Sequence, residues 1–268
     1  PMLAGFFSLA GVYLISSLLH SRWAGLLAGF VYVASPYHLF FNRMAHKAAL
    51  LECLFVWLVW LTLRMAQPGT RVGAWQSLLL GLLVALSLLT EATAILFVLL
   101  PLPFILLFSK IIPNWKPVIL CYLLAFTVGS FPFAYLYFTD DHYQVKNIFI
   151  PAFNSMAQTG MSEMILTFPH KIVQNANGVL EHFTAYLTWP VVISAMFFFL
   201  ISLGNMDRNL VIMSANFFLP VLALMGTAGA GFSRYYLFCA TPLLIWGSLG
   251  MAEIFSFIKR AFSRNLAY

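Results

Sequence analysis

Long apolar runs with very few charges dominate this sequence. The stretch from Trp75 to Phe108 contains a single charged residue, Glu91. Over all 268 residues, 62% are hydrophobic and 8% are charged, whereas soluble domains carry about 25% charged residues. A surface so poor in charge cannot be hydrated, and disordered chains need the opposite composition. We therefore expect an all-α integral membrane protein.

The apolar segments predict a polytopic bundle of about nine membrane helices. A single helix over the run 75–108 would be about 50 Å long, against about 30 Å for the hydrocarbon core. We therefore divide this run near residues 89–92. The expected helices cover about 2–19, 23–34, 48–63, the two halves of 75–108, 118–138, 184–203, 210–224 and 235–257.

Residues 139–182 form the one extended polar region of the sequence. We expect a non-cytoplasmic loop with one or two short interfacial helices, around 162–172. Asp140 and Asp141 resemble half of a metal-binding pair, but no third ligand is recognisable. Zinc, P-loop and serine-hydrolase motifs are absent from the sequence. We therefore expect no metal and no cofactor.

The net charge and the cysteines argue against a nucleic-acid partner and against disulfide bonds. The net charge is +6, yet no basic run suits a nucleic-acid groove, so we expect no nucleic-acid partner. Cys53, Cys121 and Cys239 lie far apart in apolar stretches, which indicates buried packing rather than disulfides. Gly25 and Gly29 form a small-residue face typical of helix packing.

The basic residues predict the orientation, because Lys and Arg concentrate in cytoplasmic loops. We place the first helix from outside to inside, which puts nine of the 14 basic residues on the cytoplasmic side. The expected cytoplasmic ones are Arg22, Arg64, Arg71, Lys110, Lys116, Arg208, Lys259, Arg260 and Arg264, and the outer ones are Arg43, Lys47, Lys146, Lys171 and Arg234. This orientation depends on the division near Glu91.

Three candidate cations, Arg43, His46 and Lys47, precede the third expected helix at its outer end. Arginine offers a planar fork that matches phosphate oxygens, and lysine offers a compact point charge. Such a cluster can hold a lipid phosphate. The alternative is that these side chains only reach ordinary lipid headgroups.

Two acids have apolar neighbours. Glu52 lies about one turn inside the third expected helix, where an ionisable group either faces a cavity or pairs with another side chain. Glu91 lies at the expected turn after residue 89. It either shapes a substrate pocket or stands near the positive end of the next helix, with Thr90 as that helix's cap.

Arg234 and Tyr235 follow a stretch of small residues, 226–231, and precede the last expected helix. A flexible turn that delivers an arginine and aromatic rings to the membrane edge suits a phosphate or a sugar. The alternative is an aromatic belt with an arginine that reaches the headgroups.

Several of these motifs together resemble a known family. Residues 5–48, GFFSLAGVYLISSLLHSRWAGLLAGFVYVASPYHLFFNRMAHKA, are similar to the second and third membrane helices of GT-C glycosyltransferases. The similar branch contains protein O-mannosyltransferases and lipid A aminoarabinose transferases. Residues 81–92, GLLVALSLLTEA, resemble a helical hairpin of that branch. The single positions that carry the resemblance are Ser35, Pro36, Tyr37, Arg43, Arg234, Tyr235 and Pro242.

The resemblance implies sugar transfer by an inverting mechanism. The implied donor is a polyprenyl-phosphate sugar, with Arg43 and Arg234 binding its phosphate, and the acceptor is a lipid, glycan or protein. It also implies a bacterial or archaeal plasma membrane with the active face outside. Family members carry the catalytic Asp in a first outer loop, which would precede Pro1. We therefore expect a fragment without its first helix and first outer loop, inactive alone.

The sequence also departs from the family pattern. Glu91 stands where the family has lysine, Ala48 stands where many members have an acid, and His46 and Lys47 replace Arg-Pro. These departures leave two alternatives open. One is a multi-pass transporter or flippase, and the other is a non-catalytic scaffold of envelope glycan assembly.

Overall fold

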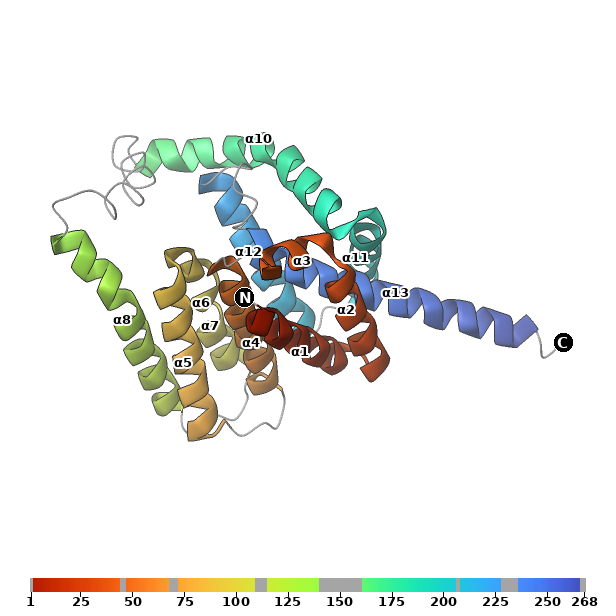
Figure 1. Ribbon diagram of the computed structural model, residues 1–268, viewed down its shortest axis with the longest axis horizontal. Helices are drawn as coiled ribbons and strands as arrows, with labels where there is room; N and C mark the ends of the chain where they lie inside the picture. Colours follow the sequence, from red (N-terminus) through yellow and green to blue (C-terminus); the bar gives the residue numbers. More distant parts are fainter. Residues whose placement is uncertain are drawn as a thin grey trace.

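The structure is a computed structural model that describes residues 2–43, 47–67, 72–108, 115–139, 161–205, 208–227 and 236–265. Every regular element in these ranges is a helix, which confirms the all-α expectation. In Figure 1 the helices pack around a shared core, and α10 (Met161–Leu187) arches across one end.

The helices follow the apolar segments of the sequence closely. In chain order they are α1 (Met2–Leu19), α2 (Arg22–Ala34), α3 (Pro36–Arg43), α4 (Lys47–Met65), α5 (Ala74–Thr90), η1 (Ala92–Ala94), α6 (Ile95–Val98), α7 (Pro101–Phe108), α8 (Trp115–Thr139), α10, α11 (Trp189–Ser202), η2 (Leu203–Asn205), α12 (Arg208–Thr227) and α13 (Leu237–Asn265).

Four helices are long and apolar enough to cross a membrane: α1, α4 and most of α12 and α13. The pair α10 and α11 would add a fifth span, although its two parts meet at 113°. Further apolar helices, over Arg22–Ala34, Ala74–Thr90, Ile95–Leu107 and Val118–Pro132, are shorter. The chain is therefore an integral membrane protein. The nine spans stay a prediction, because they require the shorter helices to cross as well.

Local sequence signals explain where the helices begin and end. The Ser21 hydroxyl accepts a hydrogen bond from the Ala24 amide, which caps the start of α2. Ser35 is extended, as the residue before a proline prefers, and Pro36 then begins α3. The predicted division of the run 75–108 is confirmed, since α5 ends at Thr90 and Glu91 is extended.

Two expectations differ from the structure. Thr90 does not cap the following helix, because its hydroxyl donates to the Leu86 carbonyl inside α5. In the region 139–182, residues 140–160, with Asp140 and Asp141, lie outside the described part of the chain. The expected helix around 162–172 falls within the much longer α10. Polar residues interrupt its apolar pattern, and so the sequence suggested only short helical pieces.

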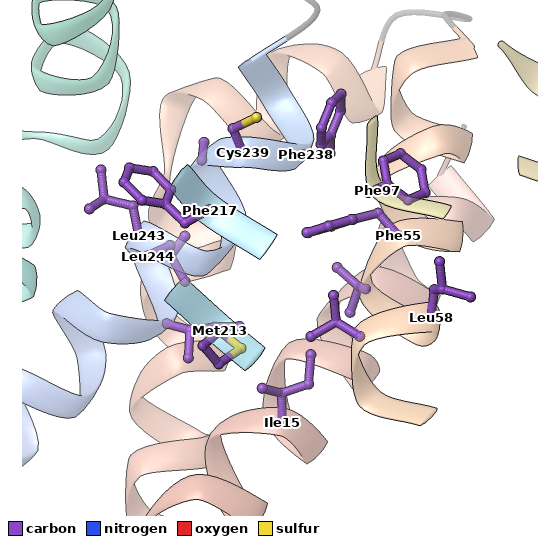
Figure 2. Packing of buried hydrophobic residues seen from close by; sticks show 14 of the residues in the cluster. Ile15, Phe55, Leu58, Phe97, Met213, Phe217, Phe238, Cys239, Leu243 and Leu244 are labelled. Atoms are coloured by element: carbon purple, nitrogen blue, oxygen red, sulfur yellow. The ribbon is translucent and has the colours of Figure 1, made fainter. Parts of the chain in front are cut away.

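The core is built from close helix contacts and stacked rings. Phe55, Phe97 and Phe238 bring α4, α6 and α13 together, with ring centroids 5.0–5.6 Å apart (Figure 2). A Cβ added at Gly25 would lie 2.1 Å from Ser17 Oγ, so Gly25 lets α2 approach α1. The cysteines are free, as expected: Cys53 and Cys239 are buried and Cys121 is half-buried.

Candidate functional site

Buried polar side chains gather at one end of the bundle, around Glu52 on α4. The Glu52 side chain is 0% exposed. Thr241 on α13 donates a hydrogen bond of 2.8 Å to Oε1, and Tyr32 on α2 donates one of 3.3 Å to Oε2. Because an unpaired buried carboxylate is costly, these contacts account for its position among apolar helices. Its own helix provides neither of the two donors.

His38 on α3 is the third partner of this carboxylate. Its Nε2 lies 3.2 Å from Glu52 Oε1, and both side chains are 0% exposed. The other ring nitrogen, Nδ1, is 2.8 Å from Ser35 Oγ. The imidazole also packs against the Tyr32 ring, with centroids 4.5 Å apart. Two side chains, His38 and Tyr32, therefore attach α3 and the end of α2 to α4.

Asn42 extends this network to the last turn of α3. Its amide donates a hydrogen bond of 3.2 Å to the Tyr32 hydroxyl. A Cβ added at Gly5 on α1 would lie 2.6 Å from Asn42 Cγ, so Gly5 leaves room for the amide. We call Tyr32, His38, Asn42, Glu52 and Thr241 the Glu52 cluster. It fixes the helix that ends at the neighbouring residue, Arg43.

A second, more exposed pair lies at the same end of α4. Lys47 Nζ is 2.5 Å from Glu91 Oε2, with exposed fractions of 50% for Lys47 and 14% for Glu91. The pair connects the first turn of α4 to the break after α5. A cation at a helix N-terminus is disfavoured by the helix dipole, and the Glu91 carboxylate offsets that charge. The lysine remains accessible to an anion from the membrane edge.

The structure brings some of the candidate residues predicted from the sequence together, and others lie outside its described part. Lys47, Glu52 and Glu91 come together at one end of the bundle. The backbone of Arg43 ends α3 beside the Glu52 cluster. The Arg43 side chain, His46, Arg234 and Tyr235 lie outside the described part of the chain.

Sequence reasoning missed four members of the Glu52 cluster, Tyr32, His38, Asn42 and Thr241. A local signal existed for His38, because it stands three residues after Ser35 across a helix start. No local signal exists for Thr241, which lies 189 residues from Glu52 along the chain. Only the tertiary fold brings Thr241 into contact with Glu52.

The Glu52 cluster and the Lys47–Glu91 pair differ in whether a ligand can reach them. Glu52 and His38 are wholly enclosed, so they position helices and do not contact a substrate in this conformation. Lys47 is half-exposed and can bind an anionic group. Within the described residues, no group of three or more His, Cys, Asp or Glu side chains is placed to hold a metal ion.

At the opposite end of the bundle, other polar contacts join the ends of neighbouring helices. Arg208 donates a hydrogen bond of 2.7 Å to Gln67, which joins the start of α12 to the residues after α4. His20 Nε2 lies 2.9 Å from Glu253 Oε1 and joins the turn after α1 to α13. Arg64, in the last turn of α4, lies at this end as well. The structure therefore has two chemically distinct ends.

Comparison with protein families gives one match. The family described as dolichyl-phosphate-mannose-protein mannosyltransferase matches residues 1–135, which include α1 to α7 and most of α8. This range contains four of the five members of the Glu52 cluster and the Lys47–Glu91 pair. No curated protein and no solved structure matches the chain. The match covers half of the 268 residues and confirms the GT-C resemblance, so the chain belongs to the dolichyl-phosphate-mannose-protein mannosyltransferase family of membrane glycosyltransferases.

Proposed function

We propose that this chain is part of a membrane glycosyltransferase that takes a sugar from a polyprenyl-phosphate donor. The acceptor is a lipid, glycan or protein on the non-cytoplasmic face. The observation that carries the proposal is the half-exposed Lys47, paired with the largely buried Glu91, in the half of the chain that matches the family. Membership of this family favours sugar transfer over transport or a scaffold role.

The proposed orientation places this end of the bundle outside the cytoplasm. It combines nine crossings with the positive-inside rule, which puts Arg64, Arg208 and the basic end of α13 inside. In this orientation the two basic residues of α4 lie on opposite sides of the membrane, because Lys47 begins that helix and Arg64 is in its last turn. A donor that carries its sugar on an outer lipid phosphate would meet Lys47 first.

In the proposed reaction the cations hold the donor phosphate as it leaves. Arg43, Lys47 and Arg234 supply positive charge, with Lys47 oriented by Glu91. Such charge stabilises the phosphate that departs from the sugar carbon while the acceptor hydroxyl attacks from the other side. His46 and Tyr235 complete the proposed binding surface. A carboxylate takes the proton of the acceptor hydroxyl.

Sugar transfer by the full-length protein tests this proposal. The assay measures label transferred from radioactive polyprenyl-phosphate mannose to acceptor in reconstituted vesicles. Arg43→Ala and Arg234→Ala should each lower the rate at least 100-fold, since each removes a charge proposed to bind the leaving phosphate. Arg64→Ala, at the other end of α4, is the matched control and should retain the parent rate. Parent rates in both the Arg43 and Arg234 variants would refute the assignment.

A further inference from the structure

A cavity of about 250 Å³ lies at the end of the bundle opposite the Glu52 cluster. α1 and α11 end at this cavity, α12 begins at it, and α13 passes along it. Its lining includes Leu19, Ser202, Asn209, Trp246 and Glu253. Because α1 is long enough to cross a membrane and ends here, the cavity lies at the level of the lipid headgroups. Its size suits a small polar group, since drug-sized pockets hold about 300–1,000 Å³.

Glu253 supplies this cavity with a negative charge. Its Oε1 lies 2.9 Å from His20 Nε2, and the other ring nitrogen, Nδ1, lies 3.1 Å from the Ser21 hydroxyl. A neutral imidazole accounts for both contacts, with the Ser21 hydroxyl donating to Nδ1 and Nε2–H donating to the carboxylate. Glu253 therefore keeps its charge, and within the described residues His20 is its one ion-pair partner. The second carboxylate oxygen is left to accept from a ligand.

Two hydrogen-bond donors line the same cavity. Trp246 is only 2% exposed, and its indole N–H has no acceptor within the described part of the chain. The side-chain oxygen of Asn209 accepts from Gln67 Nε2 at 3.3 Å and from Arg208 Nε at 3.4 Å. The amide nitrogen of Asn209 is therefore turned away from these two donors. An enclosed donor without an acceptor is costly, and an oxygen atom bound in the cavity would remove that cost.

An apolar slot adjoins this cavity across Glu253. The slot has a volume of about 240 Å³ and shares Ile201 and Glu253 with the first cavity. The rest of its lining comes from α11 and α13 and consists of Phe197, Ile254, Phe257 and Arg260. Three of these four side chains are apolar, so the slot suits hydrocarbon. A polar cavity beside an apolar slot at the headgroup level fits an amphiphile better than a soluble ligand.

We propose that the cavity and the slot bind one phospholipid with a primary ammonium, the chemistry of phosphatidylethanolamine. The ammonium pairs with Glu253, the phosphate oxygens accept from Trp246 and Asn209, and an acyl chain occupies the slot. One carboxylate beside two neutral donors matches a zwitterion. A choline headgroup has no N–H to donate to the carboxylate, and a headgroup without a cation would leave Glu253 facing a phosphate. The site lies at the other end of the bundle from Lys47 and does not depend on the proposed sugar transfer.

Titration of the detergent-solubilised full chain with short-chain lipids tests this proposal. The midpoint of thermal unfolding is measured, because a ligand that binds only the folded state raises it. Dihexanoyl phosphatidylethanolamine should raise the midpoint in a saturable way. Dihexanoyl phosphatidylcholine, and phosphoethanolamine without acyl chains, should not do so at the same concentration. An equal shift with either of these two compounds, or no shift with the ethanolamine lipid, would overturn the proposal.

Variants at the cavity assign the binding to it. Glu253→Gln removes the charge at nearly constant size and should weaken binding of the ethanolamine lipid about 10- to 100-fold. Trp246→Phe keeps an aromatic ring but removes the N–H, and it should weaken binding about 10-fold. Glu181→Gln is the matched control, because it removes an exposed acid from α10, which contacts the last turn of α12 through Asn175. Parent affinity in Glu253→Gln, or an equal loss in Glu181→Gln, would show that the lipid does not bind at this cavity.

Discussion

Glu52 shows how one buried charge organises several helices. Its carboxylate contacts side chains from α2, α3 and α13 while it belongs to α4. Removing one partner of a buried polar network is costly, because the remaining groups keep their desolvation penalty without their hydrogen bonds. The stability of this end of the bundle should therefore depend strongly on this one residue.

Glu52→Ala should lower the free energy of unfolding by about 3–5 kcal/mol, because it removes the acceptor of the Tyr32 and Thr241 hydroxyls and the carboxylate beside His38. Glu52→Gln keeps one of the two acceptor oxygens, so one of the two hydroxyls retains its acceptor, and it should cost less, about 1–3 kcal/mol. Denaturant unfolding of the detergent-solubilised protein measures both. Glu253→Ala is the control, since that carboxylate is 39% exposed, and it should cost less than about 1 kcal/mol. Equal losses at Glu52 and Glu253 would show that the cluster does not stabilise the fold.

At the scale of elements, the sequence predicted the apolar helices well because their pattern is local. The expected helix 2–19 coincides with α1, and the division at Glu91 occurs where a single helix would have been too long. The length of α10 was missed because its signal is an amphipathic face and not an apolar run. For Glu52 the sequence left two alternatives, a cavity or a paired side chain. It could not identify the partners of Glu52, because they come from other helices that only the packing of the fold brings close.

Small residues determine how closely these elements approach, and α11 against α13 is the clearest case. Gly250→Ala should lower the free energy of unfolding by about 1–3 kcal/mol, because the new methyl group would meet the Ser194 backbone at 2.1 Å. Gly204→Ala is the matched control, since no atom lies within 4 Å of a Cβ there. Thermal unfolding of the two variants in the same detergent measures the difference. Equal midpoints would contradict the close α11–α13 contact.

At the scale of the whole molecule, the chain separates two kinds of polar chemistry along the bundle. One end holds the Glu52 cluster and the accessible Lys47, and the other holds contacts such as Arg208–Gln67 that join helix ends. The proposed function uses the first of these ends, where the accessible Lys47 would meet a lipid-borne phosphate. The rigid cluster keeps the end of α3 in place beside the more exposed Lys47–Glu91 pair.

The proposed role of Lys47 in holding the donor phosphate is tested by the affinity of the reconstituted full-length protein for polyprenyl phosphate. Lys47→Met keeps the length of the side chain but removes its charge, and a lost charge-assisted hydrogen bond should weaken binding about 10- to 100-fold. Lys47→Arg should retain most of the affinity, and Arg64→Met, at the far end of the same helix, should retain all of it. Equal affinities of the Lys47→Met and Arg64→Met variants for polyprenyl phosphate would contradict the proposed role of Lys47.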